Sequence, residues 1–274
     1  MLNRPATDTQ ITHRRRLWLY VFGALMVLFL VTPALIVIPM SFSDSRFLKF
    51  PPESFSLRWY DNFFSSVEWR DASMVSIKTA LLVVLMATPI GTLAAYGLHV
   101  SRSRLSVAVQ TALITPLIIP LILIAIAVFF LYARLGLNNS VIGLALAHTT
   151  LAIPFVLVTV LAGLKGYDLN QEMVARSLGA NRPWAFLTIT LPQIRFSVIS
   201  GALLAFITSF DEVVIALFIA GGESSTLTRR MFNALRDEID PTVAAISTLL
   251  IGMAVVLMAL SQWASNRAEG NQRD

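Results

Sequence analysis

The chain has 274 residues, of which 56% are hydrophobic and only 14% charged, and its mean hydropathy is +0.71. Soluble globular domains average about 25% charged residues, so this composition excludes an ordinary soluble enzyme or binding domain. The absence of cysteine excludes disulfides and thiolate metal sites, and the net charge of +5 has an explanation in the membrane rather than in nucleic acid.

Six apolar stretches are each long enough to cross a bilayer core about 30 Å thick. They cover residues 17–40, 76–100, 105–132, 141–164, 196–220 and 243–263. Lipid offers no partner for an exposed N–H or C=O, so each stretch must be helical. Interior prolines (Pro89, Pro116, Pro120 and Pro154) predict bent helices in a packed bundle. We therefore expect an all-α membrane protein with six transmembrane helices in a single domain over residues 1–274.

The charge distribution predicts the orientation of these helices. If the N-terminus is inside, the cytoplasmic segments carry twelve basic and five acidic residues, whereas the outer segments carry nine of each. The Arg14–Arg16 run directly precedes the first span. Lys and Arg near span ends concentrate on the cytoplasmic side, so we expect both termini and the 165–195 loop in the cytoplasm.

The largest predicted outer segment, residues 41–75, contains an aromatic run from Trp59 to Phe64. Trp and Tyr are enriched at headgroup level, which favours an interfacial belt. The alternative is a docking surface for an extracytoplasmic partner.

The 165–195 loop is polar, basic and helix-forming, unlike the apolar stretches on either side. Asp168 can cap a first helix, with Gln171 three residues later in an arrangement like a capping box. Gly179 can end that helix in a conformation with positive φ. Asn181 and Pro183 can start a second short helix. This pattern predicts helix, glycine elbow, helix, and on physical grounds alone it also fits an amphipathic element lying on the inner leaflet.

Two acids, Asp211 and Glu212, lie inside the fifth predicted span. An ionisable group at membrane depth costs about 2.5–3.5 kcal/mol even on the milder insertion scales, so each must face a cavity or a partner. One interpretation is that they line the path of a cationic substrate. The other is that they satisfy backbone groups at a break in the helix.

Residues 172–192 resemble the cytoplasmic EAA loop of ABC importer permeases. That pattern is Glu-Ala-Ala, three residues, Gly, about nine residues, then Ile-x-Leu-Pro. The matching positions are Leu178, Gly179, Ala180, Phe186, Ile189, Leu191 and Pro192. The sequence departs at the triplet, because Met173-Val174-Ala175 stands where Glu-Ala-Ala is expected and the acid comes one residue early, at Glu172.

The resemblance covers nearly the whole chain. The segment from Ser209 to Ala216, SFDEVVIA, is similar to the fifth helix of spermidine/putrescine permeases, and Leu57-Arg58-Trp59-Tyr60 is similar to their first outer loop. The chain most resembles the shorter of the two permease subunits in such systems. The implied fold is that of a type I ABC importer permease, a MetI-like bundle in the bacterial inner membrane.

The resemblance also implies partners. They are a dimer of separate ATPase subunits that binds ATP and Mg²⁺, a second permease subunit, an extracytoplasmic substrate-binding protein and membrane lipid. This chain would itself bind no cofactor or metal and would not be an enzyme; it has no G-x-x-x-x-G-K-[ST] phosphate loop. The residues expected to couple to the ATPase are Glu172, Met173, Ala175, Arg176, Gly179 and Ala180, with Glu172 and Arg176 as a polar rim pair at i, i+4.

Three functions fit these observations. The first is an ABC permease for putrescine or spermidine, and the second is the same machine for another solute, such as ferric iron, thiamine or an opine-like compound. The third is a secondary transporter or channel that uses Asp211 and Glu212 for ion coupling. Among weaker candidates, His148 is expected to hydrogen-bond across helices rather than bind metal, and Tyr96 and Tyr132 are expected to be packing or interface residues.

Overall fold

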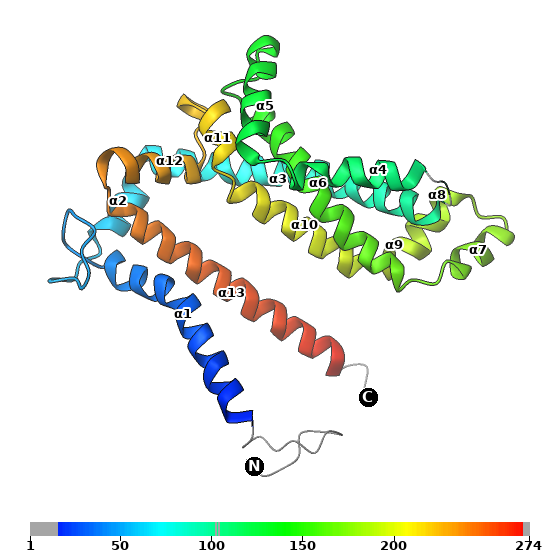
Figure 1. The fold of residues 1–274 in the computed structure, drawn as a ribbon, viewed down its shortest axis with the longest axis horizontal. Helices are drawn as coiled ribbons and strands as arrows, with labels where there is room; N and C mark the ends of the chain where they lie inside the picture. Colours follow the sequence, from blue (N-terminus) through cyan, green and yellow to red (C-terminus); the bar gives the residue numbers. More distant parts are fainter. Residues whose placement is uncertain (1–15, 102, 104, 271–274) are drawn as a thin grey trace. The chain divides into compact units, whose positions relative to one another are not determined.

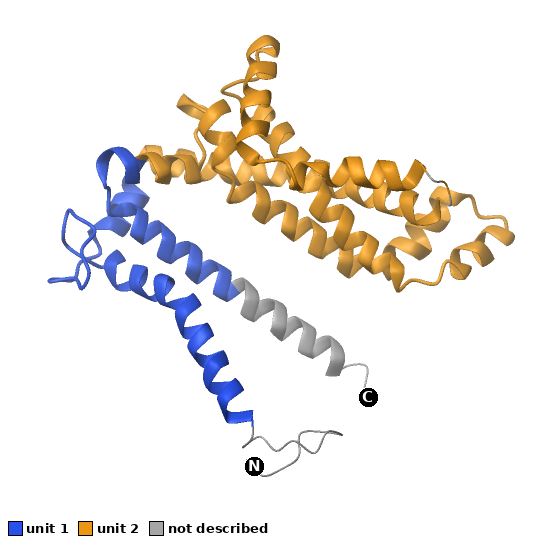
Figure 2. Cartoon of the chain, in the orientation of Figure 1, with its two compact units in different colours: residues 1–66, 234–274 blue, residues 67–233 orange. Residues whose placement is uncertain are grey.

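The computed structural model describes residues 16–101, 103 and 105–270, with residues 257–270 described through their backbone only. This part of the chain is helical apart from loops and one isolated bridge between Ser43 and Phe55. The chain divides into two compact units, residues 1–66 with 234–274, and residues 67–233 (Figure 2). Several basic residues used to orient the chain lie outside the described residues: Arg4, Arg14, Arg15, Arg102, Arg104 and Arg273. The cytoplasmic position of the termini therefore stays a prediction.

The first unit is built from helices near the two ends of the chain. They are α1 (Leu17–Ser41), α2 (Arg58–Ser65), the π-helical turn η5 (Ala234–Glu238) and α13 (Thr242–Gly270). Both α1 and α2 pack against α13. Asn62 Nδ2 donates to Thr242 Oγ1 at 2.8 Å, and Ser41 Oγ lies 2.7 Å from Tyr60 Oη. The first predicted span is confirmed as a helix, α1, and the aromatic run forms α2, in which Trp59 is buried.

The second unit contains the remaining elements. They are α3 (Val67–Val100), α4 (Leu105–Ile114), η2 (Thr115–Leu117), α5 (Leu121–Leu135), α6 (Val141–Lys165), α7 (Asn170–Ser177), α8 (Arg182–Ala185), η3 (Phe186–Thr190), α9 (Leu191–Gln193), α10 (Arg195–Phe210), α11 (Val214–Ile219), η4 (Gly222–Ser224) and α12 (Leu227–Asn233). The fourth predicted span matches α6. The second predicted span lies within α3, but this helix begins at Val67 and so takes in residues that were expected to form an outer loop.

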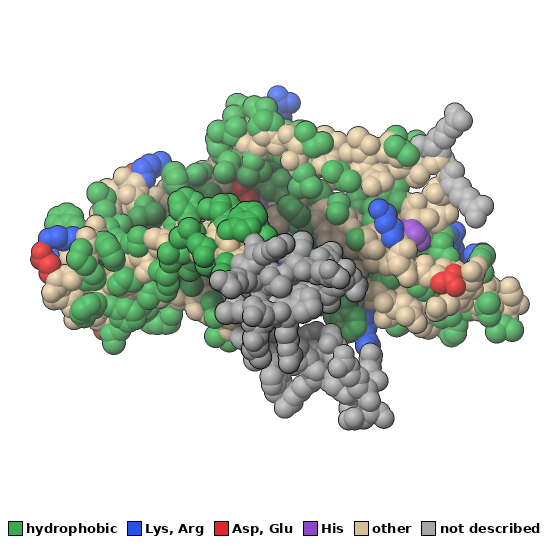
Figure 3. All heavy atoms as spheres, turned by 60° about the horizontal axis from the view of Figure 1, so that its bottom comes forward, with side chains coloured by type: hydrophobic (Ala, Val, Ile, Leu, Met, Phe, Trp, Pro, Cys, Tyr) green, Lys and Arg blue, Asp and Glu red, His purple; other side chains and the backbone are tan. Residues whose placement is uncertain are grey.

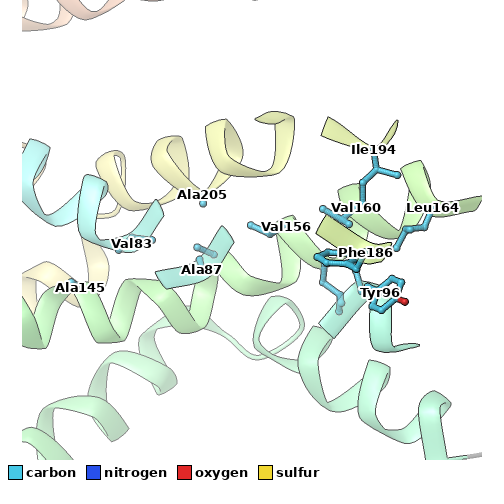
Figure 4. Packing of buried hydrophobic residues seen from close by; sticks show 13 residues of the cluster. Val83, Ala87, Tyr96, Ala145, Val156, Val160, Leu164, Phe186, Ile194 and Ala205 are labelled. Carbon is cyan, nitrogen blue, oxygen red and sulfur yellow. The ribbon is translucent and has the colours of Figure 1, made fainter. Parts of the chain in front are cut away.

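The centre of this unit is a bundle of α3, α6 and α10 (Figure 1). Small residues allow the helices to approach closely, as is common where membrane helices pack. Val156 on α6 is fully buried between two glycines: a Cβ built on Gly91 of α3 would lie 2.7 Å from Val156 Cβ, and one built on Gly201 of α10 would lie 3.3 Å from Val156 Cα. Figure 4 shows Val156 within the buried cluster that these helices share.

Two predicted spans are broken rather than continuous. The third is bent by 95° between residues 105–117 and 121–135. The cause is the Pro116–Pro120 segment, because proline lacks an N–H and disfavours helix in the residue before it. The fifth is interrupted between Phe210 and Val214. The chain also turns by 81° where residues 182–193 lead into α10.

Among the described residues, α1, α3 and α6 are long and apolar enough to cross a membrane, and two bent pairs raise the number of candidate spans to five. The sixth predicted stretch lies on α13, whose described apolar part, residues 242–256, is shorter than a span. Many large hydrophobic side chains are exposed, and they cover much of the face drawn in Figure 3. Such a surface is the one expected of a multi-pass membrane protein, in which lipid covers the apolar side chains.

Candidate functional site

The 165–195 loop forms two short helices joined by a sharp elbow. The first, α7, begins at Asn170, whose N–H donates to Asp168 Oδ1 at 3.0 Å. This is the side-chain cap predicted for Asp168, since a capping oxygen accepts an N–H of the first turn. The Gln171 side chain makes no reciprocal bond to the Asp168 N–H, so the full capping box does not form.

The elbow itself follows the prediction. Gly179 has φ +100°, a value that favours glycine because it has no Cβ. Asn181 then caps α8, its Oδ1 accepting from Trp184 N–H at 2.9 Å, and Pro183 lies in the first turn, where no N–H is needed. A Cβ on Gly179 would meet no atom within 4 Å. The glycine is therefore required for backbone conformation and not for packing within this chain.

One face of α7 and the residue after it is apolar and exposed. Met173 is 53% exposed, Val174 61% and Leu178 85%. Arg176 is also exposed, whereas Ala175 and Ala180 are half-buried. Three exposed apolar side chains within six residues form a surface that is suited to being covered by another molecule. We call Met173, Val174 and Leu178 the apolar face of α7.

Glu172 does not lie on this exposed surface. Its side chain is buried, with the residue only 2% exposed. Tyr96 Oη donates to Glu172 Oε1 at 2.6 Å, and Thr190 Oγ1 donates to Oε2 at 2.9 Å. The expected rim pair with Arg176 is therefore wrong: both carboxylate oxygens point inward, toward α3 and η3.

Sequence reasoning missed the residues that receive Glu172. Tyr96 was expected to pack, and its ring does lie on Phe186 with centroids 4.6 Å apart, but its hydroxyl also bonds Glu172 and accepts from Arg182 Nε at 3.2 Å. No role was predicted for Thr190. The sequence did contain a signal for this burial, because the acid stands at position 172 and not at position 173. One residue along a helix rotates the direction of a side chain by about 100°. That rotation separates buried Glu172 from exposed Met173.

The break in the fifth predicted span is organised by Glu212. Its Oε1 accepts from Ile215 N–H at 2.8 Å and its Oε2 from Ala216 N–H at 3.1 Å. These N–H groups belong to the first turn of α11, which has no partner within its own helix for them. The residue is 6% exposed. Of the two interpretations of this acid, the geometry supports the one in which it satisfies backbone groups at a break.

Neighbouring helices hold this break in place. His148 on α6 is fully buried, and its Nδ1 lies 3.0 Å from Ser209 Oγ on α10, so the predicted hydrogen bond across helices is confirmed. His148 Nε2 is 3.3 Å from Glu212 Oε2 but outside hydrogen-bonding geometry. Thr228 Oγ1 on α12 donates to the Glu212 carbonyl at 2.9 Å. Within the described part of the chain, no three His, Cys, Asp or Glu residues are grouped to hold a metal.

Asp211 differs from its neighbour because it is exposed and lines a pocket of ≈ 570 Å³. The pocket walls come from the bent third span, from α6 and from both sides of the break, and they are mostly apolar. They include Pro116, Leu121, Leu151, Phe155, Ile207, Thr208 and Val214. Both predicted substrate acids line this pocket, but they differ in what they contact: Asp211 is exposed, whereas both carboxylate oxygens of Glu212 accept from backbone N–H groups.

Comparisons with known proteins agree with this architecture. Residues 87–270 match the model of the family described as binding-protein-dependent transport system inner membrane component. The chain is 31% identical to the spermidine/putrescine transport system permease protein PotC of Haemophilus influenzae, over 85% of this chain and 91% of that protein. It is 29% identical to the putrescine transport system permease protein PotI of Escherichia coli K12, over 92% of each.

Solved structures share the fold at much lower identity. A chain of the bacterial alginate ABC transporter, solved in complex with alginate pentasaccharide-bound periplasmic protein, superposes with a TM-score of 0.67 at 17% identity. The match covers 90% of this chain and 93% of that one.

Proposed function

Because the chain belongs to the family of binding-protein-dependent transport system inner membrane components, we propose that it is one of the two permease subunits of an ATP-driven ABC importer for putrescine or spermidine. The family makes it a transporter component of the inner membrane, not an enzyme. The relatives named above, which transport spermidine and putrescine, support the cargo. The single observation on which the coupling role depends is the apolar face of α7, presented by the fixed elbow at Gly179.

The proposed partner at α7 is one subunit of an ATPase dimer that binds ATP and Mg²⁺. Met173, Val174 and Leu178 would insert into a groove on that subunit, and Arg176 would contact its rim. Half-buried Ala175 and Ala180 keep the contact close, because neither side chain projects beyond one carbon. The acidic contact expected from this helix is not available, since Glu172 is buried. We therefore propose a mainly apolar groove on the ATPase.

The rest of the proposed assembly follows from the same family. It comprises six membrane spans with cytoplasmic termini in one permease domain over residues 1–274, a second permease subunit, and a substrate-binding protein outside. The binding protein is supported by the alginate transporter, which was solved in complex with a periplasmic protein. The sixth span would be the part of α13 that covers residues 243–263.

Asp211 is the proposed cargo contact. A polyamine is a chain of methylenes with ammonium groups, so it needs both apolar walls and anionic or carbonyl partners. The pocket beside Asp211 supplies apolar walls from three segments and one exposed carboxylate. Glu212 would act on the path only indirectly, by holding the break from which Asp211 projects.

The experiment that tests this function is reconstitution of the permease pair with its ATPase and binding protein in liposomes. We expect putrescine- or spermidine-loaded binding protein to stimulate ATP hydrolysis and to drive uptake that persists when the membrane potential is collapsed. If binding protein loaded with a different solute stimulated ATP hydrolysis, the proposed cargo would be wrong and the proposed ABC importer mechanism would stand. Uptake that stops with the potential while ATP remains high would contradict the proposal and indicate a secondary transporter.

Replacing Asp211 with asparagine is expected to weaken polyamine transport without loss of protein. Loss of one charge contact in a water-accessible site corresponds to about 1 kcal/mol, or about a fivefold rise in KM for uptake of the loaded complex. The matched control is Thr208→Val, which removes a polar group from the same pocket without changing charge. Unchanged transport by the Asp211→Asn protein would remove the case for a required charge.

A further inference from the structure

On the buried side of α7, a single carboxylate connects this helix to the rest of its compact unit. Residues 173, 174 and 178 are more than half exposed, whereas Glu172 is buried. Its two oxygens accept from Tyr96 on α3 and from Thr190 on η3. Tyr96 and Glu172 are 76 residues apart in the chain, so this bond joins a surface helix directly to the central bundle.

The α3 end of this contact is rigidly placed. Tyr96 is 8% exposed, and its ring packs on Phe186 in the cluster that also holds Leu164 and Ile194 (Figure 4). Five residues earlier, Gly91 lies directly against Val156. A displacement of the Tyr96 hydroxyl therefore requires α3 to move with it.

The α7 end is also defined, by a second pair of polar groups. Arg182 Nε donates to Tyr96 Oη and lies 4.0 Å from Glu172 Oε1, and Thr190 Oγ1 lies 3.2 Å from Tyr167 Oη. Hydrogen bonds to a carboxylate are shorter and stronger than those between neutral groups, and the low dielectric of a buried site strengthens them. Glu172 can neither rotate away nor reach solvent without losing its bonds to the Tyr96 and Thr190 hydroxyls.

We infer that the bond between Tyr96 and Glu172 is the tether through which a push on α7 is passed to α3. The inference rests on the proposed function, because it takes the apolar face of α7 as the surface on which an ATPase acts. Glu172 is then a positioning residue: it contacts neither the ATPase nor the cargo, and it fixes the helix that meets the ATPase to a helix that crosses the membrane. This tether is possible because the acid stands at position 172, on the buried side of α7, and not at position 173, which is exposed.

The test is Tyr96→Phe in the full complex of permease pair, ATPase and binding protein. This change removes one hydroxyl and keeps the ring on Phe186. We expect the ATPase to co-purify as with the wild type, because the apolar face of α7 is unchanged, and basal ATP hydrolysis to persist. The number of polyamines imported per ATP hydrolysed is expected to fall about tenfold, the factor associated with loss of a hydrogen bond to a charged group. Glu172→Gln, which keeps an acceptor oxygen for Tyr96, should retain more of this ratio than Glu172→Leu.

The matched control is Tyr60→Phe, which removes a tyrosine hydroxyl lying 2.7 Å from Ser41 Oγ in the other compact unit and should leave the ratio unchanged. A wild-type ratio in Tyr96→Phe would overturn the tether. Loss of ATPase co-purification in Tyr96→Phe would also overturn it, because the bond would then serve to fold the loop. If the wild-type complex itself showed no ATP-dependent uptake, the proposed function would fail instead, and the two failures are thereby told apart.

Discussion

Replacing Glu212 with alanine is expected to cause the largest loss of stability of any single change at the break in the fifth span. The Ile215 and Ala216 N–H groups would lose their acceptor in a buried site, and each unsatisfied group costs about 1–3 kcal/mol. We expect the detergent-solubilised protein to unfold at a clearly lower temperature and less of it to accumulate in the membrane. Thermal unfolding followed by size-exclusion chromatography measures both.

A graded series makes this result specific. Glu212→Gln keeps one acceptor oxygen and should lie between alanine and the wild type. Asp211→Ala is the matched control, since its side chain is exposed and accepts no backbone hydrogen bond in the structure. Equal destabilisation by Asp211→Ala and Glu212→Ala would contradict a capping role for Glu212.

Replacing Gly179 with valine is expected to have the largest effect on coupling. Its φ of +100° is strained for any residue with a Cβ, and most for a β-branched one. Relief of that strain would change the angle between α7 and α8 and turn the apolar face of α7 away from its partner. We expect permease to insert and accumulate normally, while ATP hydrolysis stimulated by loaded binding protein falls about tenfold or more, as a loss of about 1.4 kcal/mol in the docked state would produce.

Two further variants separate conformation from contact at this elbow. Gly166→Val is the control, because Gly166 lies in the same loop with φ −89° and has room for a Cβ. Leu178→Ala trims the exposed contact without altering the backbone, so it should weaken ATPase binding and leave the elbow intact. Normal coupling in Gly179→Val would show that the left-handed conformation is not needed for docking.

Much of the fold follows from local properties of the chain. A stretch such as residues 141–164 is apolar over the thickness of a bilayer, and its backbone must bond internally, so α6 could be placed to within one residue. The elbow was predictable for a similar reason, because Gly179, Asn181 and Pro183 each act on the backbone within a few residues. Broken spans were harder, since Pro116 and Pro120 indicate a bend but not its 95° angle, which depends on what packs against it.

The candidate site shows where local reasoning stops. Local sequence properties place Glu172 on a loop helix and Asp211 and Glu212 in an apolar stretch. The direction of the Glu172 carboxylate depends on the folded chain, because its partner Tyr96 is 76 residues away. The partners of Glu212 are only three and four residues away, but its carboxylate reaches them because α10 ends at Phe210 and α11 begins at Val214. A rotation of about 100° per residue separates buried Glu172 from exposed Met173, and which of the two faces the bundle depends on the elements that pack against α7.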